Sequence, residues 1–227
     1  MLVIMAKAPR AGMVKTRLEK WVPASAVTEL YRCLLADTIA LAQSLGSVEV
    51  AIICPAPDVH DLSRLAGDDV RVVAQTGEGL AAGLTSVFTQ FAADGQQRVV
   101  AFNSDSPHLP ARMLQNAFDA LATCDVVVGP THDGGYYLVG AKASHRGLFN
   151  SDGMGTSSAL DALLERIRDL GLSVRLADPF YDIDVGSDLI RLDAELRLSP
   201  AKAPRTAAWL AQWRHVVEPL RAGAGNL

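Results

Sequence analysis

The sequence lacks the marks of several protein classes. No apolar stretch among its 227 residues approaches the length that a membrane-spanning helix needs. The apolar run at the amino terminus is too short for the hydrophobic region of a signal peptide. Cys33, Cys54 and Cys124 are widely separated and form no Cys-x-x-Cys unit, which argues against a disulfide framework and against a structural zinc site. These absences predict a soluble protein in a reducing, cytoplasmic setting.

The chain also lacks a net positive charge. Its 21 lysines and arginines face 25 aspartates and glutamates, so the formal charge is −4 and no broad basic face is available for a nucleic acid. We therefore expect neither a nucleic acid nor a membrane as a partner. The basic residues crowd the start of the chain, which indicates a local anion site: Lys7, Arg10, Lys15, Arg17 and Lys20.

Several catalytic motifs are missing as well. A P-loop requires a second glycine directly before the lysine, but here Gly12 precedes Lys15-Thr16 alone and at the wrong distance. The nearest match to a dinucleotide fingerprint has the wrong spacing and follows the third predicted strand. No Gly-x-Ser-x-Gly elbow occurs, so covalent catalysis is not supported. His108 and His132 lack partners at metal-ligand spacing and are expected to be ordinary polar loop residues.

The hydrophobic pattern that is present predicts alternating strands and helices. Short apolar runs predict strands over 2–5, 48–54, 70–74, 98–102, 125–129 and 136–139, and an alternating pattern predicts a strand over 173–177. Apolar residues at three- and four-residue spacing predict helices over 23–45, 58–65, 80–93, 111–122, 157–170 and 187–196. They also predict one last helix after Pro204, with an apolar face between Trp209 and Leu220. Asp58 is expected to be an N-cap. Such an alternation favours an α/β fold with a mostly parallel sheet and helices on both faces.

A basic loop over 6–20 is the first candidate for chemistry. It follows the first predicted strand, so its cations would meet at the carboxyl end of that strand. Lys15 and Arg17 could neutralise phosphate oxygens, and Gly12 would let backbone N–H groups approach a polyphosphate closely. The alternative is a solvated basic loop. We favour the phosphate site, because a tight cationic loop is costly unless something anionic fills it.

Carboxylates at distant chain positions form the second candidate. Asp105 follows a buried strand, where open α/β sheets bind their ligands, although it could equally be a turn residue or a cap. Asp182 and Asp184 alternate in an extended segment and so point the same way, whereas Asp188 begins a helix and is expected to be a cap. Asp105 and Asp184 could clamp one Mg²⁺ over a polyphosphate.

A glycine-rich segment over 129–140 is the third candidate. Gly134 and Gly135 are flanked by Asp133 and Tyr136, which is typical of a loop where backbone meets ligand. The Asp-Gly pair is also the usual signal of a type I′ hairpin turn, and both interpretations can hold together.

Four segments together resemble one known family: KAPRAGMVKTRL, NSDSPHLP, GPTHDGGYYLVG and DIDVGSDL. In this order, over about residues 1–197, they resemble the DUF2064 family. That family is also described as radical-SAM/selenodomain-associated transferase 1, or as an arsenosugar-biosynthesis glycosyltransferase-like group, within the nucleotide-diphospho-sugar transferase (GT-A) superfamily. The resemblance implies a GT-A domain over 1–197, which is a Rossmann-like three-layer αβα sandwich with a mostly parallel mixed sheet. Residues 198–227 would be a helical extension packed on that domain, with a homodimer contact as the alternative.

The resemblance also implies Mg²⁺ or Mn²⁺, a nucleotide substrate (an NTP or an NDP-sugar), and four sets of site residues. The nucleotide would contact Ala6, Lys7, Gly12, Lys15, Arg17, Glu78 and Ser104. The metal would be held by Asp105 and Asp184, and the catalytic residues would be Lys15, Arg17, Asp105 and Asp133. The small-molecule acceptor would contact Asp133, Gly134, Gly135, Tyr136, Thr156 and Asp182.

The chain departs from the family pattern in two places. The segment 77–82 lacks the basic residue of the family's Gly-Asp-Leu-Gly-Glu-Arg-like stretch, which leaves an acceptor or ribose contact there open. Met154 stands where a tryptophan commonly precedes the Gly-Thr pair, here Gly155-Thr156, so the acceptor can differ from that of other members.

The fold hosts both nucleotidyl and glycosyl transfer, so the reaction must be argued from the site. The loop with Lys15 and Arg17 and the Asp-x-Pro at Asp105 resemble those of nucleotidyltransferases, whereas glycosyltransferases more often carry Asp-x-Asp at that strand. We therefore expect a transferase that moves a nucleotidyl group from an NTP to a small phosphorylated or carboxylated acceptor and releases pyrophosphate. A glycosyltransferase that uses an NDP-sugar is the alternative, and a non-catalytic nucleotide-binding module is the least favoured interpretation.

Overall fold

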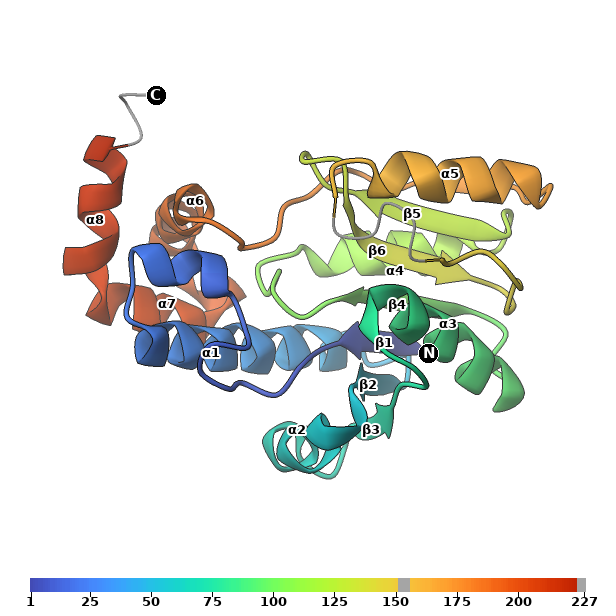
Figure 1. Cartoon of the computed structure of the whole chain (residues 1–227), viewed down its shortest axis with the longest axis horizontal. Helices are drawn as coiled ribbons and strands as arrows, with labels where there is room; N and C mark the ends of the chain where they lie inside the picture. The colour runs from blue at the N-terminus through green and yellow to red at the C-terminus, as the bar shows by residue number, and fades with distance from the viewer. Residues whose placement is uncertain (151–155, 224–227) are drawn as a thin grey trace. The chain divides into compact units, whose positions relative to one another are not determined.

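The computed structural model describes residues 1–150 and 156–223, and these contain one seven-stranded sheet in the order β3-β2-β1-β4-β6-β5-β7 (Figure 1). The strands are β1 (Leu2–Met5), β2 (Val50–Cys54), β3 (Arg71–Ala74), β4 (Val99–Asn103), β5 (Val126–Pro130), β6 (Tyr136–Ala141) and β7 (Val174–Leu176). The α-helices are α1 (Ala24–Gln43), α2 (Val59–Ala66), α3 (Gly79–Ala93), α4 (Ala111–Ala120), α5 (Ala159–Asp169), α6 (Gly186–Leu198), α7 (Pro204–Gln212) and α8 (Arg214–Gly223). Short 3₁₀ turns are η1 (Thr16–Lys20), η2 (Ala56–Asp58) and η3 (Pro200–Lys202).

The sheet is mixed and mostly parallel, as the sequence predicts. β1 pairs parallel with β2 and β4, β2 pairs parallel with β3, and β5 pairs parallel with β7. β6 runs antiparallel to both β4 and β5. The central strands are continuous apolar runs because helices cover both of their faces. The predicted α/β fold is confirmed.

The chain divides into two compact units. The sheet unit comprises Met1–Ala8, Ala42–Asn103 and Leu109–Tyr181, and it holds all seven strands. The helical unit comprises Pro9–Leu41, Ser104–His108 and the chain from Asp182 onward. The domain boundary at 197/198 stays a prediction.

The sheet unit has three layers. α3 and α5 cover one face, where the core contains Val3, Ala51, Val99, Ala101, Leu84, Val87, Phe91, Leu163 and Ile167. The other face is covered by α4, since a side chain at Gly140 of β6 would meet Leu121, at the end of α4, and Val100 of β4. Because successive strand residues point to opposite faces, Val99 and Val100 serve different layers of the core.

The helical unit is held together by a buried carboxylate. Asp37 of α1 accepts hydrogen bonds from the backbone N–H and the hydroxyl of Thr206, both at 2.8 Å, and from the guanidinium of Arg205 at 3.3 Å. Thr206 lies in the first turn of α7, so Asp37 satisfies one of the N–H groups that a helix start leaves without a partner. This contact ties α1 to α7.

Two local predictions are wrong, and a third holds only in part. The last predicted helix is two helices, because the backbone turns at Trp213 while its carbonyl still accepts from Val216 and Val217, so the apolar spacing persists across the break. Part of the basic loop forms η1, which has Leu18 as its single buried side chain and hence no apolar period to detect. Asp58 is the N-cap residue of α2, as predicted, but its side chain makes no hydrogen bond to the helix start, because its Oδ2 accepts the N–H of Ala8 at 2.9 Å.

Within 1–150 and 156–223, no helix has both the length and the apolar character that crossing a membrane requires. The thiols of Cys33, Cys54 and Cys124 are free.

Candidate metal and anion site

The segment that carries Asp105 is anchored on α1 within the helical unit. It directly follows β4, whose last residue is Asn103. The buried hydroxyls of Ser104 and Tyr31 share a hydrogen bond of 2.9 Å, and the Thr38 hydroxyl donates to the Ser104 carbonyl at 3.2 Å. Two side chains of α1, those of Tyr31 and Thr38, therefore fix the backbone directly before Asp105.

Asp182 and Asp184 enter the site from the extended segment before α6. The carboxylate of Asp188 accepts the backbone N–H groups of Asp184 at 2.9 Å and Val185 at 2.8 Å. Asp188 is thus the cap that the sequence predicts, and its capping fixes the backbone that presents Asp184.

Asp105, Asp182 and Asp184 form a carboxylate cluster, in which one oxygen of each lies within 4.8 Å of the others. The Asp105 side chain is 13% exposed, and its Oδ1 is buried with no hydrogen-bond partner among the described residues. Three hard oxygen donors, one of them buried and unsatisfied, fit Mg²⁺ or Mn²⁺. Asp182, which we expected to contact the acceptor, belongs to this cluster; its two-residue spacing from Asp184 was the signal for it.

The side chain of Lys15 lies against this cluster. Its Nζ contacts Asp105 Oδ2 and donates to Asp184 Oδ1 at 2.6 Å, and the side chain is only 8% exposed. Burial lowers the pKa of Lys15, but the carboxylates of Asp105 and Asp184 outweigh burial and hold the pKa above its ordinary value. Lys15 is therefore a cation at neutral pH.

Arg17 stands at the edge of the same cluster. Its Nη1 lies 3.4 Å from Asp184 Oδ2, and its side chain is 67% exposed. A pair so open to water contributes at most about 1 kcal/mol, so the guanidinium is free to exchange this partner for another anion.

The surroundings of Asp182 change the pKa of its carboxyl. Burial, followed by repulsion from Asp105, raises the pKa of its carboxyl from 3.8 to about 7, and the nearby Lys15 offsets only part of this. The cluster thus holds more negative charge than Lys15 alone neutralises.

The other residues predicted to bind the nucleotide fall in both units. In the sheet unit, the N–H of Ala6 bonds to the Ile53 carbonyl, Lys7 is exposed, and Glu78 is an exposed residue at the start of α3. In the helical unit, Gly12 has φ +72° in an exposed turn. Ser104 is buried with its hydroxyl bonded to Tyr31. Their nucleotide contacts stay predictions.

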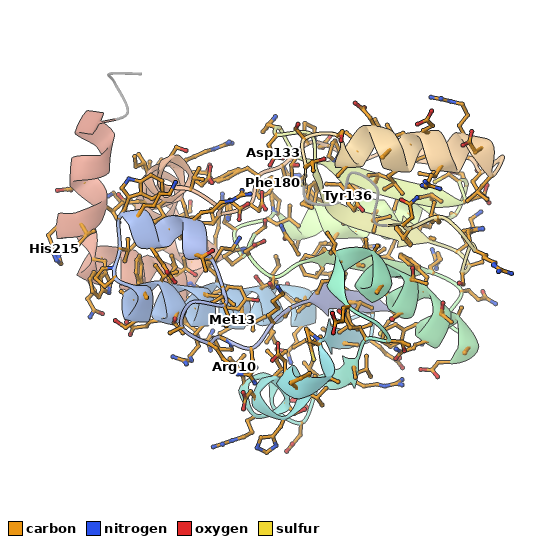
Figure 2. All side chains as sticks on the ribbon, in the orientation of Figure 1. Arg10, Met13, Asp133, Tyr136, Phe180 and His215 are labelled. Atoms are coloured by element: carbon orange, nitrogen blue, oxygen red, sulfur yellow. The ribbon has the colours of Figure 1, made fainter. Side chains whose placement is uncertain are left out.

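The glycine-rich segment of the sheet unit is a hairpin loop between β5 and β6 (Figure 2). Asp133 Oδ1 accepts the Thr131 hydroxyl at 2.5 Å and the Gly135 N–H at 3.3 Å. Gly134 has φ +86°, its carbonyl accepts the N–H of Leu160, and a Cβ there would lie 1.9 Å from the Ser157 carbonyl. The predicted hairpin is confirmed, but its turn is not of type I′, because Asp133 lacks the positive φ that this turn requires at both central residues. The bond from Leu160 holds the loop against the start of α5.

Two further acceptor residues lie near this loop in the sheet unit. Burial raises the pKa of Tyr136, which packs against the core. Thr156 precedes α5, and its hydroxyl bonds to that of Ser158 at 2.8 Å. The departure at Met154 lies outside the described residues. The contacts of Tyr136 and Thr156 with an acceptor stay predictions.

The chain matches the model of a known family. The profile of the DUF2064 family, described as "Uncharacterized protein conserved in bacteria (DUF2064)", matches residues 38–156, about half of the chain. No curated protein matches the sequence.

Solved structures give a wider set of similarities. A candidate nucleotide-diphospho-sugar transferase from Desulfovibrio desulfuricans G20 superposes with a TM-score of 0.87 at 26% identity, over 96% of both chains. A nucleotidyl transferase from Methanothermobacter thermautotrophicus gives 0.57 at 20% identity, over 87% of this chain and 98% of that one. CMP:2-keto-3-deoxy-manno-octonic acid synthetase, complexed with CTP, gives 0.54 at 13% identity over the same shares. The two more distant similarities concern the fold alone.

Proposed function

This chain belongs to the DUF2064 family, and we propose that it is a metal-dependent, nucleotide-binding transferase. The reaction proposed first is transfer of a nucleotidyl group from a nucleoside triphosphate to a small phosphorylated or carboxylated acceptor, with release of pyrophosphate. One observation carries the proposal: the carboxylates of Asp105, Asp182 and Asp184 converge on one point, with Lys15 and Arg17 beside them. Carboxylates for a cation and basic side chains for phosphate oxygens are the two requirements of phosphoryl transfer chemistry.

The metal ligands in this proposal are Asp105 and Asp184, and Asp182 completes the set. A bound Mg²⁺ or Mn²⁺ would offset the negative charge of the phosphates and of the leaving group. The buried Oδ1 of Asp105 supports this assignment, since a buried acceptor without a donor is costly unless a cation or water satisfies it.

The side chains of the basic loop would hold the nucleotide. Arg17 is exposed and can present its planar fork to two phosphate oxygens at once. Lys15 is charged at neutral pH because of its carboxylate neighbours, so it is available as a counter-ion. In the sheet unit the loop with Asp133 and Tyr136 is proposed to contact the acceptor. Catalysis would then rest on positioning and charge neutralisation, with no protein nucleophile.

Transfer of a sugar from an NDP-sugar is the second candidate, favoured by the similarity to the Desulfovibrio desulfuricans protein at 26% identity. In that reaction Asp133 would orient or deprotonate the acceptor. The association with radical-SAM or arsenosugar proteins, the cytoplasmic setting, the absence of a nucleic acid partner and the homodimer alternative all stay predictions.

The test is an activity panel. The protein is incubated with each NTP, Mg²⁺ or Mn²⁺ and a set of sugar phosphates and small carboxylic acids, and pyrophosphate is measured. A parallel panel of NDP-sugars is scored for release of the NDP. Pyrophosphate release that depends on acceptor and metal supports the first candidate, release of NDP supports the second, and nucleotide binding without turnover refutes both and favours a binding module.

Variants connect the activity to the site. Asp105→Asn and Asp184→Asn keep the shape of the side chain but remove its charge, and each is expected to lower kcat/KM at least about 100-fold, since a lost electrostatic contact in a transition state costs about that much. Asp69→Asn, at an exposed aspartate of the sheet unit, is the matched control and should leave kcat/KM unchanged. Full activity in both Asp105→Asn and Asp184→Asn would show that the cluster is not the site.

A further inference from the structure

A cation of the chain's own already occupies the carboxylate cluster. The ammonium of Lys15 contacts Asp105 and lies 2.6 Å from Asp184 Oδ1, and 92% of its side chain is hidden from solvent. These are two of the three carboxylates that would hold a metal ion. The same carboxylates therefore have two candidate partners, one built into the sequence and one from solution.

The backbone at Lys15 is unusual in a way that fits this contact. Among residues 1–150 and 156–223, Lys15 is the single non-glycine residue with positive φ, at φ 49° and ψ 35°. L-residues with side chains rarely adopt this left-handed conformation. Val14 and Leu18 on either side are buried, and the Leu18 N–H bonds to the Lys15 carbonyl at 2.9 Å. The flanking residues thus fix the backbone in a form that sends the side chain into the cluster.

The two partners compete for the same carboxylates. A Mg²⁺ ion binds a carboxylate oxygen at about 2.0–2.1 Å, so an ion on Asp184 Oδ1 would take the space that the Lys15 ammonium fills when it donates to that oxygen at 2.6 Å. A divalent and a monovalent cation would then lie within a few ångströms of one another in a largely buried site, where their repulsion is poorly screened.

We propose that Lys15 is a displaceable internal counter-ion: it neutralises Asp105 and Asp184 in the metal-free protein, and a divalent cation must drive it off before it can bind. The inference rests on the proposed function in one respect, since the phosphates of the nucleotide would be the next partner of the released ammonium. Metal and nucleotide then bind with positive coupling. The metal frees Lys15 for the phosphates, and the phosphates remove the competitor of the metal. By linkage the two couplings are equal.

The decisive experiment removes the competitor. Binding of Mn²⁺ is measured by the electron paramagnetic resonance signal of the free ion, in wild type and in Lys15→Met, without nucleotide. We expect Lys15→Met to bind Mn²⁺ about 10-fold more tightly, within the usual range of coupling between sites. Lys20→Met removes the same charge from an exposed position of η1 and should match wild type. Equal or weaker Mn²⁺ binding by Lys15→Met would overturn the proposal.

A measurement on the unaltered protein guards against misfolding of the variant. Amine acetylation followed by peptide mass spectrometry reports how accessible and how deprotonated each lysine is. Lys15 should react slowly without metal, because it is buried and held in its charged form, and several-fold faster when Mn²⁺ is present. Lys20 serves as the internal control and should not change. A Lys15 rate that Mn²⁺ leaves unaltered, or slows, contradicts displacement.

Nucleotide is added last, to separate this inference from the proposed function. In wild type a non-hydrolysable NTP should tighten Mn²⁺ binding, and in Lys15→Met it should tighten it less. If Lys15→Met gains Mn²⁺ affinity but no nucleotide binds either protein, the counter-ion role stands and the proposed function fails. If nucleotide binds and turns over while Lys15→Met gains no Mn²⁺ affinity, the function stands and the counter-ion role is refuted.

Discussion

The histidine next to the metal-site segment should make this protein sensitive to acid. His108 ends the segment that carries Asp105, and it is 2% exposed, in contrast to the ordinary loop position that its sequence context suggested. Burial, together with the positive charges of Lys202 and Arg191, lowers the pKa of its imidazole from 6.5 to about 3. The folded protein therefore keeps His108 neutral over the whole range in which an unfolded chain would protonate it.

The magnitude follows from linkage. Between pH 6.5 and pH 3 the unfolded chain binds one proton more than the folded chain at this residue, so the free energy of unfolding falls as the pH falls. The contribution of neutral His108 to the free energy of unfolding is complete above pH 6.5 and is lost progressively below it. At pH 5 the loss is about 2 kcal/mol, since each pH unit below 6.5 costs about 1.4 kcal/mol.

Urea unfolding at pH 7.5 and at pH 5.0 measures this loss. Wild type should lose about 2 kcal/mol more between the two values than His108→Gln does, because contributions from all other groups cancel in the comparison. His60→Gln, at an exposed position, should behave as wild type. An imidazole that titrates near pH 6.5 by NMR in the native protein, or equal pH dependence of His108→Gln and wild type, would refute the reasoning.

Three further outcomes are expected. Gly134→Ala should lower the free energy of unfolding by about 1–3 kcal/mol more than Gly147→Ala in urea titrations, because both have φ +86° but only Gly134 faces a backbone carbonyl. Equal losses of unfolding free energy in the two variants would contradict the close packing of Gly134 against the Ser157 carbonyl. Tyr31→Phe leaves the Ser104 hydroxyl without its partner and should cost about 1–3 kcal/mol in thermal unfolding, with weaker Mn²⁺ binding. Burial, with Asp58 nearby, raises the pKa of the Cys54 thiol to about 11, so native alkylation at pH 8 should be about 100-fold slower than that of a thiol with the ordinary pKa of 9.0; fast labelling would show that the site opens.

The sequence predicted the elements of the fold well and their arrangement only in part. Each of the seven predicted strands is present. The central strands were found as apolar runs because strands that are buried on both faces must be apolar throughout, whereas β7 is exposed and was found by its alternation. Periodicity says nothing about direction or order, so the antiparallel insertion of β6 between β4 and β5 could not be derived from it. The break at Trp213 was hidden for a related reason, since apolar spacing continues through a single turn residue.

The sequence predicted the carboxylates of the candidate site but not the contact that Lys15 makes with them. Strand-tip and alternation arguments identified Asp105, Asp182 and Asp184, which converge in space although nearly eighty residues separate the first two in the chain. The partner of Lys15 could not be found in this way. The positive φ of Lys15 and the burial of its side chain depend on how η1 packs, and no local pattern encodes that packing.

The carboxylate partners of Lys15 change how a basic loop should be interpreted. A cationic loop after a strand is costly unless an anion fills it, and here the chain itself supplies the anion. When all three carboxylates are ionised, which for Asp182 requires a pH above about 7, they leave one excess negative charge beside Lys15 and Arg17, and this charge repels a polyphosphate. One divalent cation reverses the sign to one excess positive charge. Nucleotide binding should therefore be weak in EDTA and should appear with Mg²⁺ or Mn²⁺ in a titration calorimeter, and equal affinity with and without metal would show that the phosphates bind elsewhere.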